Sequence, residues 1–208
     1  HTPGALREAM RRGRATVFHP TKAGPFYLLM PINTQPEMVA VNVAALPDTA
    51  TPAPLVTTVA GVLSEAARVI ASYDRVVIKA GGGTRKFAPL VRALAEKTGA
   101  PVILSPGSTG VLPDAHPLNM HVGGSKGSIS GNFAMAQAEL LIAIGTRAVC
   151  QSDCSGIGYP QVQQVININA DADDVMHYNH TLPIQGDIGA ILSQLLPRLD
   201  GTQGSGRR

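Results

Sequence analysis

At 208 residues and 44% hydrophobic content, the chain can bury one substantial core with a small appendage, and no apolar run approaches the roughly 20 residues that span a membrane. The 17 basic residues outnumber the 14 acidic ones, but six arginines lie at the two ends and leave the body between them at about −2. Because only 4% of the residues are aromatic, too few to stack on bases, nucleic acid is excluded as a partner.

The first fifty-four residues contain one predicted helix and one predicted strand. Residues 4–13 place Leu6, Ala9 and Met10 on one side of a helix. Residues 25–31 (PFYLLMP) are an apolar run between prolines, which predicts a buried strand. Further prolines up to Pro54 indicate a linker.

From Leu55 onward, predicted helices and strands alternate. Apolar residues recur at helical spacing over 55–72, and an apolar strand follows at 75–80. The alternation predicts an α/β fold, a Rossmann-like doubly wound parallel sheet of about five or six strands. The remaining predicted elements are helix 84–98, strands 101–105 and 118–122, helix 126–138, strands 140–144 and 163–168, a helical turn at 172–177, strand 182–185 and helix 187–199.

Glycine turns follow several of these strands, at the carboxyl edge where such sheets bind ligands. Amides of Gly81, Gly82 and Gly83 could meet a phosphate at the start of the next helix, or the glycines could simply make a tight turn. The turn lacks the third glycine of a dinucleotide fingerprint, and no acidic residue ends the next strand, which disfavours plain NAD binding. Gly124 lies in a second turn (GGSKGS), where Ser125 is the candidate N-cap of the following helix.

Two charged residues follow later strands. Arg147, in Gly145-Thr146-Arg147, either contacts an anion or pairs with an acid such as Asp153 or Asp171. Asp171 is placed to cap the next helix.

The two cysteines are too few for a disulfide scaffold and indicate a reduced, cytoplasmic chain. Cys150 and Cys154 could join His177 and His180 in a zinc site, but CxxxC and HxxH are permissive spacings. We therefore expect no metal site and no catalytic residue in this chain.

The order of these motifs resembles the central domain of thiamine-diphosphate-dependent enzymes of the acetolactate synthase and benzoylformate decarboxylase type. The residues that carry the resemblance are RVVIKAGGG, the PDAHP segment from Pro113 to Pro117, GGSKGS and LLIAIGTR. GPFYLLMPIN (Gly24 to Asn33) is similar to the last strand of the pyrimidine-binding domain that precedes this one in the family. The resemblance implies that 1–54 is the tail of that domain plus a linker, that 55–200 is a central domain of the DHS-like NAD/FAD-binding type, and that 201–208 is a flexible linker.

The resemblance also implies a function for the parent protein, an acetolactate synthase-like carboligase or decarboxylase that acts on 2-oxo acids. Thiamine diphosphate and Mg²⁺ would be held by the pyrimidine- and diphosphate-binding domains, which are missing here, and the parent would be a homo-oligomer. The family's GDG-to-NN metal segment is absent, because Gly186-Asp187 is followed by Ile188. The fragment alone is therefore expected to bind neither cofactor and to be inactive.

In flavin-containing members of that family, a G-x-x-G turn and a G-x-R arginine at these places approach the cofactor, and an Asp lies near the adenine ribose. The resemblance thus implies an FAD or ADP site. Those members continue after the arginine with a run like FDDR, whereas this chain reads AVCQSDC. The implied cofactor-binding residues are Gly81, Gly82, Gly83, Gly124, Gly145, Arg147 and Asp171.

A second hypothesis is a free-standing FAD/NAD-binding module resembling electron-transfer flavoprotein or transhydrogenase domains. Such a module has no reason to begin with an orphan helix and strand, so residues 4–33 favour the first hypothesis. A sirtuin-like deacylase would need a catalytic His and a CxxC pair, and neither fits.

Overall fold

The computed structural model describes residues 3–19, 22–40, 60–154, 158–176, 178 and 180–200. The chain divides into two compact units, His1–Pro54 and Leu55–Arg208. Of the linker expected up to Pro54, residues 41–54 lie outside the described residues, as does the linker expected at 201–208. Within those residues, no helix is both long and apolar enough to cross a bilayer.

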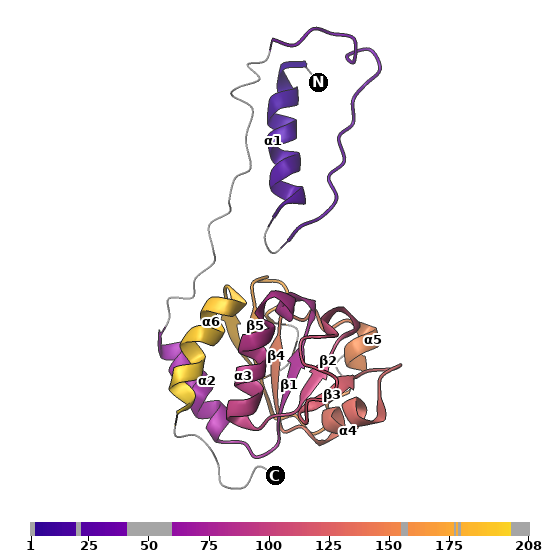
Figure 1. The fold of residues 1–208 in the computed structure, drawn as a ribbon. Helices are drawn as coiled ribbons and strands as arrows, with labels where there is room; N and C mark the ends of the chain where they lie inside the picture. Colours follow the sequence, from indigo (N-terminus) through magenta and orange to yellow (C-terminus); the bar gives the residue numbers. More distant parts are fainter. Residues whose placement is uncertain are drawn as a thin grey trace. The chain divides into compact units, whose positions relative to one another are not determined.

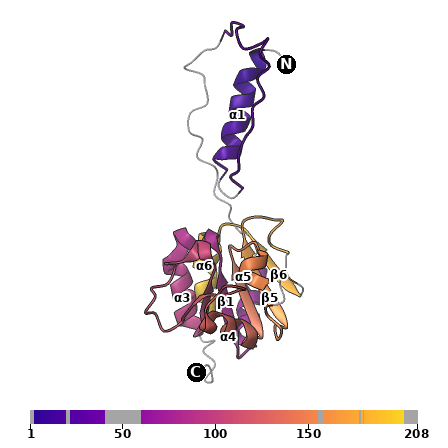
Figure 2. The same cartoon turned by 90° about the vertical axis from the view of Figure 1, so that its right-hand side faces the viewer.

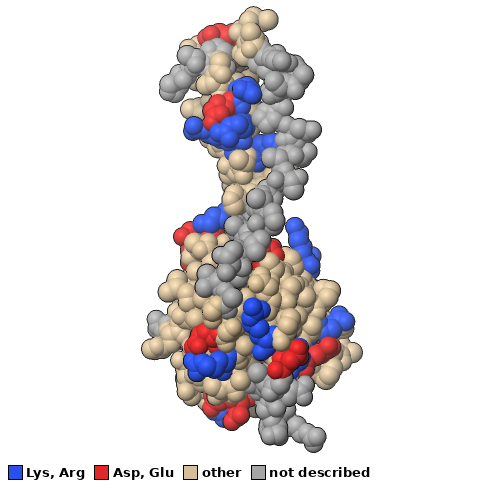
Figure 3. Space-filling view, turned by 90° about the vertical axis from the view of Figure 1, so that its left-hand side faces the viewer, with Lys and Arg blue, Asp and Glu red and all other residues tan. Residues whose placement is uncertain are grey.

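In the smaller unit, helix α1 (Leu6–Val17) follows a 3-10 turn at Pro3–Ala5 and runs further than the helix predicted over 4–13. Glu8 accepts hydrogen bonds from Arg11 and Arg12 one turn later, and these bonds lower the pKa of Glu8 to about 2. In Figure 3 the Lys and Arg atoms of this unit form one cluster around acidic atoms. On the larger unit, the basic and acidic atoms lie in several separate patches. This intrahelical pairing stabilises the part of α1 that the sequence predicted.

The strand predicted at 25–31 does not form. The segment runs beside α1 (Figure 1), and the ring of Phe26 lies so close to Gly13 that a Cβ there would come within 2.5 Å of it. The backbone of 26–29 makes no hydrogen bond to another described residue. The prediction is wrong because a strand needs a neighbouring strand, and the described part of this unit offers none.

The larger unit contains a six-stranded, all-parallel sheet in the order β3-β2-β1-β4-β5-β6. This confirms the predicted doubly wound sheet. The chain reverses direction of growth between β1 and β4, which places their carboxyl ends at the switch point of the fold. The strands are β1 (Val76–Ala80), β2 (Val102–Leu104), β3 (Asn119–Val122), β4 (Leu140–Ile144), β5 (Gln164–Asn169) and β6 (Thr181–Gln185).

Helices cover both faces of this sheet. On one face lie α2 (Ala60–Ala71), α3 (Ala88–Thr98) and α6 (Ile188–Leu195), and on the other α4 (Ile129–Gln137) and the short α5 (Cys150–Asp153). Figure 2 shows α4 and α5 on the near side of the sheet. Two 3-10 segments extend this set, Gly82–Phe87 before α3 and Leu196–Leu199 after α6.

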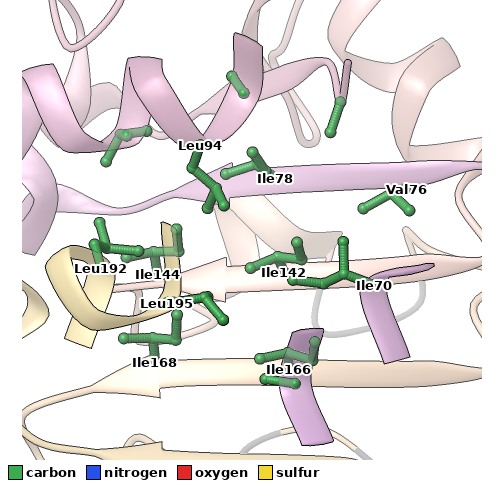
Figure 4. Packing of buried hydrophobic residues seen from close by; sticks show 14 of the residues in the cluster. Ile70, Val76, Ile78, Leu94, Ile142, Ile144, Ile166, Ile168, Leu192 and Leu195 are labelled. Atoms are coloured by element: carbon green, nitrogen blue, oxygen red, sulfur yellow. The ribbon is translucent and has the colours of Figure 1, made fainter. Parts of the chain in front are cut away.

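The larger hydrophobic cluster lies under α2, α3 and α6. Figure 4 shows side chains of these helices packed on alternate residues of β1, β4 and β5. A smaller cluster on the opposite face includes Val77, Ile103 and Met135. Because both faces are covered, the central strands are buried and mostly apolar instead of alternating with polar residues, with Lys79 in β1 and Asn167 and Asn169 in β5 as the buried polar exceptions.

Two predicted helix caps, Ser125 and Asp171, are wrong. Helix α4 begins at Ile129, and its N-cap is Ser128, whose Oγ accepts from the amide of Gly131, instead of Ser125. The turn that contains Gly124 therefore extends three residues further than predicted before the helix begins. The helical turn predicted at 172–177 is a set of turns over its described residues, so Asp171 caps no helix there.

Candidate functional site

The glycine turns after β1 and β4 pack backbone against backbone. The amide of Gly81 donates to the carbonyl of Ile144 at 2.8 Å, and that of Gly83 donates to the carbonyl of Gly145 at 3.1 Å. A Cβ on Gly81 would lie 2.1 Å from the oxygen of Gly145. Gly145 itself has φ +56, a left-handed conformation. Gly81 and Gly145 are therefore required by this close approach, and the Gly83 amide already has a partner.

Gly82 and Gly83 form the open part of this edge. Both residues are exposed, and the nearest atom to a Cβ on Gly82 would be the oxygen of Gly107 at 3.7 Å. A Cβ on Gly83 would lie 3.1 Å from the Cα of Gly145 and 3.4 Å from Ile188 at the start of α6. Gly83 thus borders the α6 side of the sheet, and Gly82 borders the turn after β2.

Gly124 is buried beneath α5. Its amide donates to Asn132 Oδ1 at 2.8 Å, and with φ +113 it occupies a conformation that favours glycine. A Cβ there would lie 2.1 Å from the carbonyl oxygen of Gln151 in α5. The expected turn is in place, but the chain's own helix covers it.

Arg147 and Asp171 follow β4 and β5. Arg147 is exposed, directly after Thr146, whose carbonyl accepts from Asn169 Nδ2. Asp171 is half-buried, and its Oδ1 accepts from the amide of Asp173 at 2.9 Å, which is the local turn that replaces the predicted helix cap.

The sequence reading missed a buried charge cluster on the α4 side. Lys79 of β1 has no exposed surface; its ammonium donates to the carbonyls of Ser152 at 2.8 Å and Leu104 at 3.4 Å. It also lies 3.5 Å from Oδ1 of Asp153, which is equally buried. Asp153 is therefore paired with Lys79, not with Arg147 as one of our alternatives had it. The signal in the sequence was a single lysine inside the apolar strand VVIKA.

Two tyrosines complete this cluster. Tyr159 donates to Asp153 Oδ1 at 3.3 Å, and Tyr178 makes a short hydrogen bond to Oδ2. Burial and the nearby carboxylate raise the pKa of both hydroxyls. Burial lowers the pKa of Lys79, while Asp153 opposes that shift. The cluster therefore joins β1, α5 and the segments before and after β5.

The described residues include no group of three or more His, Cys, Asp or Glu side chains that could hold a metal ion. The zinc ligands considered from the sequence fall partly outside them, since His177 and the side chain of Cys150 are not described. Cys154 is a free thiol.

Residues 63–195 match the family described as "Thiamine pyrophosphate enzyme, central domain". "Acetolactate synthase" of Mycobacterium bovis is 31% identical over 138 residues, which are 65% of this chain and 22% of the relative. "Acetolactate synthase isozyme 1 large subunit" of Escherichia coli is 31% identical over 143 residues, 66% of this chain and 25% of the relative. "3D-(3,5/4)-trihydroxycyclohexane-1,2-dione hydrolase" of Listeria monocytogenes is 31% identical over 68% of this chain and 22% of the relative.

The chain spans about a quarter of the length of the curated relatives it matches. The family match covers most of the larger unit and confirms the resemblance inferred from the motif order. A free-standing module of the electron-transfer flavoprotein or transhydrogenase type is not favoured, because the matched family is a different one. This chain belongs to the thiamine pyrophosphate enzyme family, and residues 63–195 are its central domain.

Proposed function

We propose that this chain is the central part of a thiamine-diphosphate-dependent enzyme that joins or splits 2-oxo acids. The names of two relatives, both acetolactate synthases, carry this proposal, together with the family match over 63–195. In such enzymes the cofactor supplies the carbanion chemistry, and the protein binds and orients it. The parent would be a cytoplasmic homo-oligomer.

The segments that hold thiamine diphosphate and Mg²⁺ belong, in this proposal, to domains outside the chain. The described residues do not fit the metal, since they include no cluster of three candidate ligands. The sequence has no GDG-to-NN segment either, because Ile188 follows Gly186-Asp187. Residues 1–54 are proposed to be the tail of the pyrimidine-binding domain with its linker, and 201–208 to begin the next linker.

An assay of two proteins tests the proposal. The purified 208-residue chain, supplied with thiamine diphosphate, Mg²⁺ and pyruvate, is expected to show no turnover. The longer parent protein under the same conditions is expected to form acetolactate or to release carbon dioxide. Turnover by the short chain, or none by a folded parent with any 2-oxo acid, would contradict it.

We also propose that the open part of the carboxyl edge can take the phosphate of FAD or ADP. The exposed Gly82, Gly83 and Arg147 fit an anion, since glycines permit close approach and a guanidinium pairs with phosphate. The backbone packing of Gly81 and Gly145 would support this surface, Asp171 would lie near the ribose as the resemblance implies, and Gly124 would not take part while α5 covers it.

Calorimetry with ADP and FAD tests this site. Replacing Arg147 by Ala is expected to weaken binding by about 1–3 kcal/mol, the range for a charge-assisted contact. Arg92, exposed on α3, supplies a matched control, and Arg92→Ala should bind as the unchanged chain does. Absence of binding at millimolar nucleotide would make the domain purely structural.

A further inference from the structure

The buried cluster around Lys79 lies on the face of the sheet that carries the smaller hydrophobic cluster. Side chains alternate along a strand, so Lys79 shares a face with Val77, while Ile78 and Ala80 point to the larger cluster. An ammonium with no exposed surface is costly unless it is paired and hydrogen-bonded. The groups that pair with the Lys79 ammonium therefore have to lie at the carboxyl end of β1.

Two of the three partners of Lys79 belong to α5. Ser152 supplies a carbonyl and Asp153 a carboxylate, and only the carbonyl of Leu104 comes from the sheet. Without α5, the ammonium would keep a single partner at the carboxyl end of β2. The carboxylate thus stands where an anionic ligand of Lys79 would otherwise lie.

The same helix closes the glycine turn after β3. The carbonyl of Gln151 accepts from the amide of Ser125 at 3.0 Å. A Cβ on Gly124 would meet Gln151 and also Ser152, whose Cα would be 2.7 Å away. Glycine turns before helices are common anion sites because their amides are accessible, and here α5 removes that access.

Tyr159 and Tyr178 hold the carboxylate of Asp153 in place. Each donates a hydroxyl hydrogen bond to Asp153, one to each carboxylate oxygen. They come from residues before and after β5, so the carboxylate is held by two segments besides β1. A helix of four residues has little stability of its own, and it depends on such contacts.

We infer that residues 149–154 are a built-in occupant of the carboxyl edge, with Asp153 bound to Lys79 in place of a phosphate-bearing ligand. The segment excludes such ligands from the α4 side of the edge. Its displacement creates a second anion site from Lys79 and the turn at Gly124. This site is distinct from the one proposed at Gly82 and Gly83, because Gly83 borders Ile188 of α6 on the opposite face of the sheet.

Amide hydrogen exchange measures how firmly residues 149–154 are held at the carboxyl edge. In Asp153→Asn, which keeps the side-chain shape but removes the charge, amides in 147–159 should exchange about tenfold or more faster, the factor for the loss of a charged hydrogen bond. Glu139→Gln, which breaks the ion pair with Arg75, is the matched control and should leave the exchange of amides in 147–159 unchanged.

Tyr178→Phe provides a second variant. It removes one hydrogen-bond donor to Asp153 with both charges intact and should accelerate exchange in 147–159 by about fivefold. If Asp153→Asn fails to fold, Tyr178→Phe decides, and unchanged exchange in that variant contradicts the inference.

Pyrophosphate binding tests the second anion site, which residues 149–154 cover. Calorimetry at millimolar pyrophosphate should detect about tenfold tighter binding to Asp153→Asn, or to Tyr178→Phe if the first does not fold, than to the unchanged chain. Adding Lys79→Met to the same variant should abolish that gain while exchange in 147–159 stays fast. Equal binding by the unchanged chain, or a gain that survives Lys79→Met, overturns the second anion site. Loss of nucleotide binding in Arg147→Ala alone would concern only the other site.

Discussion

At the scale of single residues, the buried pair of Lys79 and Asp153 sets the electrostatics of the α4 face. Each ion pays a desolvation penalty, and the hydrogen bonds from the tyrosines and to the carbonyls offset it. Removal of one partner leaves the other buried and uncompensated, which typically costs about 3–5 kcal/mol. The pair therefore specifies the position of α5 more than it adds net stability.

The raised pKa values of Tyr159 and Tyr178 predict an alkaline transition. The unfolded chain releases tyrosine protons near a pH of about 10, whereas the folded chain retains these two. The free energy of unfolding therefore falls as the pH rises above about 10. The lowered pKa of Lys79 offsets part of that loss, because the lysine keeps its proton to a higher pH in the unfolded chain than in the folded chain.

Tyrosinate absorbance followed against pH checks this prediction. The chain has four tyrosines, and the signals of Tyr159 and Tyr178 should appear only together with the loss of far-ultraviolet circular dichroism. The double variant Tyr159→Phe/Tyr178→Phe should lack that late step. Ionisation of all four tyrosines before unfolding would show that the two hydroxyls are not held by Asp153.

At the scale of elements, the turns after β1 and β4 are joined through Gly81. Gly81→Ala should cost more than about 2 kcal/mol, because its Cβ would lie 2.1 Å from a backbone oxygen that cannot move without displacing β4. Gly82→Ala is the control, and its nearest atom at 3.7 Å predicts a change within about 0.5 kcal/mol. Chemical denaturation measures both, and equal effects would mean that the two turns do not pack so closely.

The start of α4 gives a second prediction at this scale. Ser128→Ala should destabilise the fold by about 1 kcal/mol, since Ser128 Oγ accepts from the free amide of Gly131. Ser125→Ala should have little effect, because Ser125 is exposed and precedes the helix. Thermal unfolding of both variants separates the two positions, and the reverse order of effects would restore Ser125 as the cap.

At the scale of the whole molecule, the smaller unit presents apolar surface. Tyr27 is 84% exposed and Leu29 70%, and the backbone beside them has no strand partner among the described residues. Unpaired apolar segments of this kind seek another edge or another chain. We therefore expect the smaller unit to drive self-association of the chain.

Light scattering on the full chain and on a chain that starts at Thr51 tests that expectation. Association through the smaller unit predicts a larger mass for the full chain than for the shorter chain at equal concentration. The double variant Tyr27→Ser/Leu29→Ser should reduce any association. A monomeric mass for both chains would rule out this role for the smaller unit.

The sequence by itself determined the alternation of elements, because buried strands and amphipathic helices have different periods. VVIKA and LLIAI were readable as central parallel strands since both faces of the sheet are covered. The glycine turns were readable because only glycine tolerates the backbone approach between Gly81 and Gly145. These local features sufficed for the fold class and for the family.

Only the tertiary structure decided which of these features meet. Lys79 and Asp153 are far apart in sequence, and their pairing depends on where the loop after β4 comes to lie. The burial of Gly124 under α5 has the same origin. PFYLLMP shows the converse, since its local pattern favours a strand but hydrogen bonding in a sheet requires a partner that its described surroundings do not contain. Long-range partners, which no local period encodes, settled each of these three cases.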